Sequence, residues 1–107
     1  MDIRFARPIH PGEMLREEFL VPLEMSAGQL ARALGVPRTR IERLVREETT
    51  LTLDTAVRLA RYFRTTPDFW MNMQSQYDLD CLHADRKRLA IIDAIVPLVR
   101  PDLDKVA

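Results

Sequence analysis

The sequence lacks the features that mark several common classes of protein. It has one cysteine, Cys81, which excludes an internal disulfide framework and a zinc site built from several cysteines. Its three glycines and the lack of low-complexity runs argue against a repeat protein. No apolar stretch approaches the ~18 residues that a membrane span requires, and residues 1–13 lack the apolar core of a signal peptide. We therefore expect a cytoplasmic protein that does not enter a membrane.

The net charge is also absent, because 16 basic residues balance 16 acidic ones. Any sign of nucleic-acid binding must therefore be local. Between Arg32 and Arg46 five arginines stand against one acid, Glu42, which gives a local charge of +4. Between Glu13 and Glu24 four acids stand against one arginine, a local charge of −3. A charge run is often only a solvated helix face, so the basic segment needs further evidence before it indicates a binding site.

The 107 residues, 47% of them hydrophobic, suffice for one packed domain, and their periodicity predicts an all-α fold. We expect five helices, over 11–21, 27–34, 37–46, 53–63 and 67–79. An additional C-terminal helix should end near Val96, with Pro97 and Pro101 closing the ordered fold. Ser26 and Gln29 have the spacing of a capping box, and Thr52 and Thr66 are placed to cap later helices.

The spacing of small and apolar residues within 26–46 predicts a helix-turn-helix unit. The positions that build it are Ala31, Gly35, Val36, Ile41 and Leu44. The alanine lets the two helices cross closely, and the glycine makes the sharp turn in a left-handed conformation. The three aliphatic residues attach the second helix to the body through its inner face. Its outer face, over 37–46, is then free to enter a DNA major groove.

Polar residues on this outer face and at the start of the preceding helix are the candidates for DNA contact: Gln29, Arg38, Thr39, Arg40, Arg43 and Arg46. Residues 38–40 are placed to reach bases, since arginine is the commonest reader of guanine. Arg43 suits either a base or a phosphate, whereas Gln29 and Arg46 suit phosphates. A capping role alone for Gln29, and a solvated or Glu42-paired side chain for Arg46, remain as alternatives.

The segments on both sides of this unit resemble HigA-type antitoxins of the Xre/Cro-like helix-turn-helix family. The resemblance runs from Ile9 to Leu79 and is carried by "HPGEMLREEFLVPL" before the unit and "DTAVRLARYFRTTPDFWMNMQSQYDL" after it. It implies a five-helix, lambda-repressor-like domain over residues 1–78, with the helix-turn-helix at about 26–46, and a helical extension over 79–107. The chain departs from the family where "VREETTLT" lacks a common glycine, at Arg64, where glycine is also common, and at Pro37, in place of a Ser or Thr cap.

The resemblance also implies partners. A member of this family is expected to be a homodimer that binds palindromic operator DNA, represses its own operon and neutralises a HigB-type toxin, a small mRNA endonuclease. Hydrophobic residues in the second half of the chain are candidates for contact with a second subunit or with the toxin: Trp70, Met73, Leu82, Leu89, Ile92 and Val96. Packing in the core is the alternative for the first two, and packing within the chain is the alternative for the other four, which are spaced as one helical stripe.

Other functions are less well supported by the sequence. Cys81 and His83 have no third ligand nearby, so we expect no metal and no cofactor. No catalytic constellation is present, which argues against an enzyme. Two alternatives to an antitoxin stay open: a stand-alone Xre-family repressor without a toxin, and a protein–protein module that has lost DNA binding.

Overall fold

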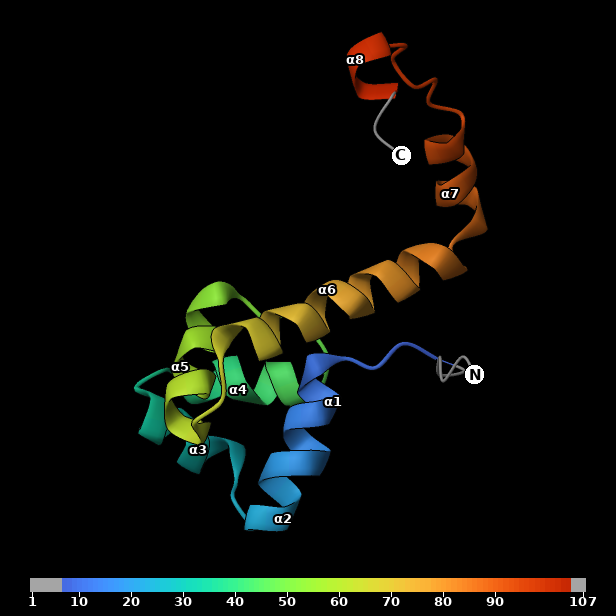
Figure 1. Cartoon of the computed structure of the whole chain (residues 1–107). Coiled ribbons are helices and arrows are strands. Elements are labelled where there is room, and N and C mark those ends of the chain that lie inside the picture. Colours follow the sequence, from blue (N-terminus) through green and yellow to red (C-terminus); the bar gives the residue numbers. More distant parts are fainter. Residues whose placement is uncertain (1–6, 105–107) are drawn as a thin grey trace.

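The computed structural model describes residues 7–104, and over that range the chain is helical without strands, which confirms the predicted all-α class. The elements are α1 (Pro11–Leu15), the π-helical turn η1 (Arg16–Leu20), α2 (Val21–Leu23), α3 (Ala27–Leu34), α4 (Arg38–Val45), α5 (Leu53–Phe63), α6 (Pro67–Ala84), α7 (Arg86–Asp93) and α8 (Pro101–Asp104). Residues 1–6 and 105–107, which the expected domain ranges include, lie outside the described residues. Helices α1 to α5 and the first half of α6 form one body, from which α6 continues toward α7 and α8 (Figure 1).

The local signals for helix starts are confirmed. The hydroxyl of Ser26 accepts a hydrogen bond from the Gln29 amide at 3.1 Å, and the Gln29 side chain accepts one from the Ser26 amide at 2.8 Å. The hydroxyls of Thr52 and Thr66 cap α5 and α6 by accepting hydrogen bonds from the Thr55 and Phe69 amides. Gly35 ends α3 with φ = 71°, the left-handed conformation that glycine adopts without a steric penalty.

The first helix does not end at residue 21, before Pro22, as the sequence suggested, but continues to Leu23, with Glu24 as its C-cap. The turn η1 precedes the proline, and in it the Val21 amide bonds to the carbonyl of Arg16, five residues earlier. A widened π-helical turn of this kind accommodates an irregularity that a regular α-helix would not. Glu24 then ends the helix in a left-handed conformation, with φ = 50°.

The C-terminal part also differs from expectation. Helix α6 runs without a break to Ala84, so the expected division after residue 78 lies inside a helix. Asp85 interrupts the chain there, because its carboxylate caps α7 by accepting a hydrogen bond from the Arg88 amide. Helix α7 ends at Asp93, so Val96 lies beyond it, and Pro101 begins α8 instead of closing the fold. The prediction of one continuous stripe from Leu82 to Val96 is therefore wrong.

The core lies where α1, α3, α4, α5 and α6 meet. Its largest fully buried side chains are Trp70, Leu15, Leu30, Ile41, Leu59 and Pro11. The indole N–H of Trp70 donates to the hydroxyl of Thr65 at 2.8 Å, and Phe19 and Phe69 pack against the ring with centroids 5.2 Å away. Because Trp70 has no exposed surface, it is a core residue and not a contact for a partner. None of the helices between residues 7 and 104 is long and apolar enough to cross a membrane.

Candidate DNA interface

Helix α4 has one buried face and one exposed face. Ile41 and Leu44 point into the core with 0% and 2% of their surface exposed, and Val36 before the helix is half-buried. On the other side, the side chains of residues 38–40 and of Arg43 are exposed. Ala31 of α3 is almost fully buried, as a residue at a close helix crossing must be. The helix starts at Arg38, with Pro37 in the cap position and extended.

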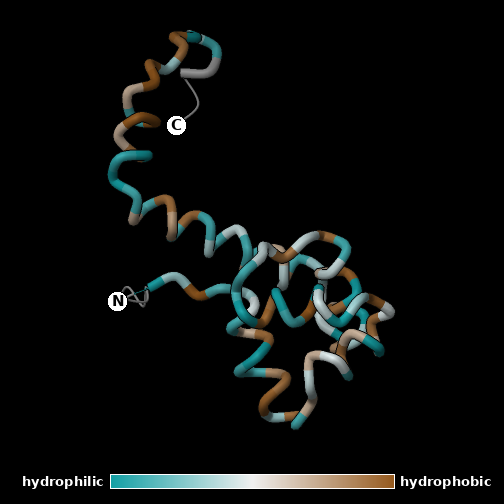
Figure 2. The backbone as a smooth tube through the Cα atoms, turned by 180° about the vertical axis from the view of Figure 1, so that it is seen from behind, coloured by the Kyte–Doolittle hydropathy of each residue, from teal (hydrophilic) through white to brown (hydrophobic). Residues whose placement is uncertain are grey.

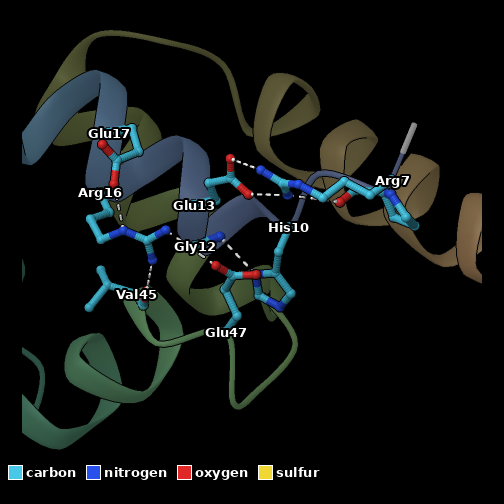
Figure 3. Close-up of polar contacts among 9 residues, drawn as sticks. Arg7, His10, Gly12, Glu13, Arg16, Glu17, Val45 and Glu47 are labelled. Carbon is cyan, nitrogen blue, oxygen red and sulfur yellow. Dashed lines mark hydrogen bonds and ion pairs between the residues drawn. The ribbon is translucent and has the colours of Figure 1, made fainter. Parts of the chain in front are cut away.

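The end of α4 is held by the first helix (Figure 3). An added Cβ on Gly12 would lie 1.8 Å from the carbonyl oxygen of Leu44, so α1 reaches this close only because residue 12 has no side chain. The Arg16 guanidinium donates to the carbonyl oxygen of Val45 and pairs with Glu47 at 3.3 Å. These contacts, which the sequence did not reveal, fix the direction in which α4 projects.

The loop after α4 contains the first departure from the family pattern. Glu47 has φ = 62°, and Arg64 after α5 has φ = 60°, both in the left-handed region where glycine is favoured. The chain therefore makes these two turns with non-glycine residues, one within the segment 45–52 and one at Arg64, the two places where the sequence departs from the glycines of the family pattern. The loop is held further along by Gln74 of α6, whose side-chain oxygen accepts a hydrogen bond from the Leu51 amide at 2.7 Å.

A groove with a volume of about 500 Å³ runs along the exposed face of α4. Its lining residues come from α4, from the loop after it and from the start of α5: Pro37, Thr39, Arg40, Arg43, Leu44, Thr49, Thr50, Leu51, Thr52, Asp54 and Thr55. Threonine hydroxyl groups and arginine guanidinium groups commonly contact DNA phosphates. The groove thus combines a helix that presents arginines with a rim of threonines.

The arginines of α4 differ in their protein partners. Arg40 donates to the Asp54 carboxylate at 2.6 Å, and the same oxygen of Asp54 accepts from Arg58 at 3.0 Å. Arg58 also donates to the carbonyl oxygen of Leu34 at 2.8 Å. The pKa of Asp54 is lowered below its usual value, mostly by the hydrogen bond from Arg40 and next by the hydrogen bond from Arg58. Arg38 pairs with Glu42 one turn on, at 3.3 Å.

Arg43 and Arg46 have no ion pair with any described residue, and both are exposed. Arg46 does not pair with Glu42, whose partner is Arg38. The Gln29 side chain is exposed at the start of α3, and only its oxygen is used in the capping box. Its amide N–H groups therefore remain available to an anion at a helix N-terminus. Asp54 and Arg58 were not predicted as site residues, although their spacing of four at the start of a helix is the signal of an ion pair.

An exposed basic helix behind a glycine turn is the arrangement of a helix-turn-helix protein. The helix-turn-helix family matches residues 15–70, about half of the chain, and the chain belongs to this family. A solved structure, the Pseudomonas aeruginosa antitoxin HigA with the higBA promoter, is 47% identical, has a TM-score of 0.77 and covers 87% of this chain and all of its own. The resemblance to HigA-type antitoxins is thereby confirmed.

Two relatives extend the comparison. Virulence-associated protein I of Dichelobacter nodosus is 50% identical over 84 residues, which are 78% of each chain. An uncharacterized HTH-type transcriptional regulator of Haemophilus influenzae is 38% identical over 102 residues, 94% of this chain and 95% of its own. The family is one of DNA-binding regulators and antitoxins, not of enzymes.

Proposed function

We propose that the chain is a DNA-binding antitoxin that represses its own operon and neutralises a HigB-type mRNA endonuclease toxin. The observation that supports this most is the exposed arginine face of α4, together with 47% identity to an antitoxin whose structure contains its promoter. In this proposal residues 38–40 read bases in the major groove, and Gln29 and Arg46 contact phosphates. Arg43, on the same face and lining the same groove, reaches a base or a phosphate.

The proposal includes a homodimer on palindromic operator DNA. Two recognition helices related by a two-fold axis would enter successive major grooves about 34–36 Å apart. The C-terminal part offers apolar surface for a second subunit or for the toxin, and it lies away from the helical body (Figure 2). Ile91, Ile95, Val96, Leu98 and Val99 are each between 67% and 86% exposed there. Exposed aliphatic side chains gathered in one segment are typical of a protein contact.

The predicted contact residues differ in how much surface they offer. Met73 is half-buried against the core, and Leu82 and Leu89 are half-buried on α6 and α7. Ile92 and Val96 are 41% and 86% exposed. We therefore place the proposed contact on residues 82–99, with its apolar surface mainly at and beyond α7.

Co-expression tests the antitoxin function. The short reading frame adjacent to the coding sequence should encode a basic protein that stops growth when it is expressed alone. Expression of this chain should restore growth, and the two proteins should co-purify. A reporter under the DNA upstream of the operon should be repressed by this chain, and less so by an Arg43→Ala, Arg46→Ala double variant. If growth stays arrested although this chain is expressed in soluble form, the proposed neutralisation of the toxin is wrong.

A stand-alone repressor is the second candidate, and the likeness over 94% of the chain to an HTH-type transcriptional regulator favours it. The two functions make the same prediction for the reporter and opposite predictions for co-expression. Repression of the reporter with no toxic neighbour to neutralise would identify a repressor without a toxin.

A further inference from the structure

Asp54 places a carboxylate in the groove that faces the proposed DNA. The other lining residues are threonines, arginines and apolar residues, so Asp54 is the acid among them. A negative charge at this position repels DNA phosphates, and it therefore opposes binding by simple charge attraction. Its contacts indicate what it contributes instead.

The carboxylate connects the recognition helix to the body of the domain. One oxygen of Asp54 accepts hydrogen bonds from Arg40 of α4 at 2.6 Å and from Arg58 of α5 at 3.0 Å. Arg58 is itself fixed by its hydrogen bond to the carbonyl oxygen of Leu34, at the end of α3. Its guanidinium also lies over the turn, since an added Cβ on Gly35 would be 3.6 Å from it. The chain of contacts thus links α3, α5 and α4 and ends at the Arg40 guanidinium.

This link leaves Arg40 able to bind a base. An arginine has five N–H donors, and Arg40 uses one nitrogen for Asp54, with no other protein partner among the described residues. A guanidinium held on one side loses less conformational freedom when it forms two parallel hydrogen bonds to guanine. The Arg43 side chain, in contrast, lines the same groove without a hydrogen bond or ion pair to any described residue.

We infer that Asp54 is a positioning residue, which holds Arg40 for reading a base and thereby sets sequence specificity. This inference rests on the proposed binding to operator DNA. It adds that Asp54 decides whether the Arg40 side chain reads a base or only binds a phosphate. Without Asp54 the Arg40 side chain is free to pair with a phosphate. Binding then depends more on charge and less on sequence.

The experiment compares two duplexes of equal length by fluorescence anisotropy. One carries the DNA upstream of the operon, and the other is a scrambled sequence of the same composition. For Asp54→Ala we expect the ratio of the two affinities to fall about fivefold or more, the share of discrimination that one arginine–guanine contact supplies. Affinity for the scrambled duplex should be unchanged or higher, and its salt slope steeper by about one unit, because one more arginine neutralises a phosphate.

A double-mutant cycle and a matched control separate positioning from a general effect. In an Arg40→Ala background, Asp54→Ala should change the ratio by less than about twofold, because the side chain it positions is gone. Asp68→Ala removes an acid from the first turn of α6, as Asp54→Ala does from the first turn of α5, but outside the groove, and it should leave the ratio within about twofold of wild type. Asp54→Ala should still unfold in one transition, with a midpoint lowered by no more than about 8 °C, because its ion pairs are exposed and contribute little to stability.

The possible results fall into two groups. If wild type prefers the upstream duplex and Asp54→Ala keeps the full ratio, the inference is wrong and the proposed function stands. If Asp54→Ala lowers the affinity ratio equally in wild type and in the Arg40→Ala background, the inference is also wrong, because Asp54 then acts without Arg40. If wild type prefers neither duplex, the proposed binding to operator DNA fails, and the inference fails with it.

Discussion

Gly12 allows the close approach of α1 to the end of the recognition helix, and its replacement by alanine gives the sharpest test of the fold. The added Cβ would lie 1.8 Å from the carbonyl oxygen of Leu44 and 2.8 Å from its carbonyl carbon. Ordinary contact between such atoms needs about 3.5 Å, so α1 and α4 must separate by more than about 1.5 Å. The obstacle is backbone, which cannot rotate away. Separation of the two helices also lengthens the hydrogen bond from the Arg16 guanidinium to the Val45 carbonyl oxygen.

The expected loss of stability follows from these distances. Overpacking costs about 1–3 kcal/mol and occasionally more, and we take the upper end because the whole helix must move. Alanine in a helix recovers about 1 kcal/mol relative to glycine. The net loss for Gly12→Ala is therefore at least about 2 kcal/mol, or a fall in Tm on the order of 10 °C for a domain of this size.

Gly28 in the first turn of α3 provides the matched control. Its added Cβ would meet the Cδ atom of Arg38 at 3.1 Å, and that flexible side chain can move aside. Gly28→Ala should therefore be neutral or stabilising by up to about 1 kcal/mol. Urea unfolding followed by circular dichroism measures both variants, at two protein concentrations because association shifts apparent stability. Gly12→Ala within about 0.5 kcal/mol of wild type would refute the close approach of the two helices.

Four further expectations can be measured on single variants. Arg38→Ala should weaken binding to the operator by about 1–3 kcal/mol and abolish the preference for one base at a single operator position. Competition assays with single-base operator variants measure both effects. Arg46→Ala should weaken all duplexes alike and reduce the salt slope by about one unit, and an unchanged slope would remove it from the phosphate contacts. Arg64→Gly should raise the free energy of unfolding by about 1 kcal/mol because φ is positive at this C-cap of α5, whereas Arg61→Gly within α5 should lower it by a similar amount. Arg7 donates a hydrogen bond to Glu13 and lowers the pKa of that carboxyl group. The ion pair therefore stabilises the fold fully above the usual pKa of 4.5, and this contribution is lost as the pH falls through the lower pKa of the folded state. Glu13→Gln should reduce the pH dependence of the free energy of unfolding by less than about 1 kcal/mol, as measured by thermal unfolding.

Local signals in the sequence predicted the helix starts well. The Ser26 capping box, the threonine caps and the left-handed Gly35 each depend on residues within a few positions of one another, so the pattern contains the whole interaction. The buried face of α4 was predictable for the same reason, since a 3.6-residue period places Ile41 and Leu44 on one side.

Features that depend on distant residues were not predictable. The approach of Gly12 to Leu44 and the link from Arg40 through Asp54 to Leu34 join segments that only the fold brings together. The C-terminal part was predicted incorrectly because the spacing of aliphatic residues from 82 to 96 suits one helix, whereas Asp85 prefers to cap a new one. Trp70 was left open between core and interface, and its burial follows from packing against Phe19, far away in sequence.

Chemical protection of operator DNA tests most directly whether the outer face of α4 enters the major groove. Dimethyl sulfate methylates guanine N7 in the major groove and adenine N3 in the minor groove. With the upstream duplex bound, we expect protected guanine N7 atoms in two clusters about one helical turn apart, and loss of one protected guanine in each cluster with Arg40→Ala. Protection limited to adenine N3, or no guanine protection at saturating protein, would contradict the account.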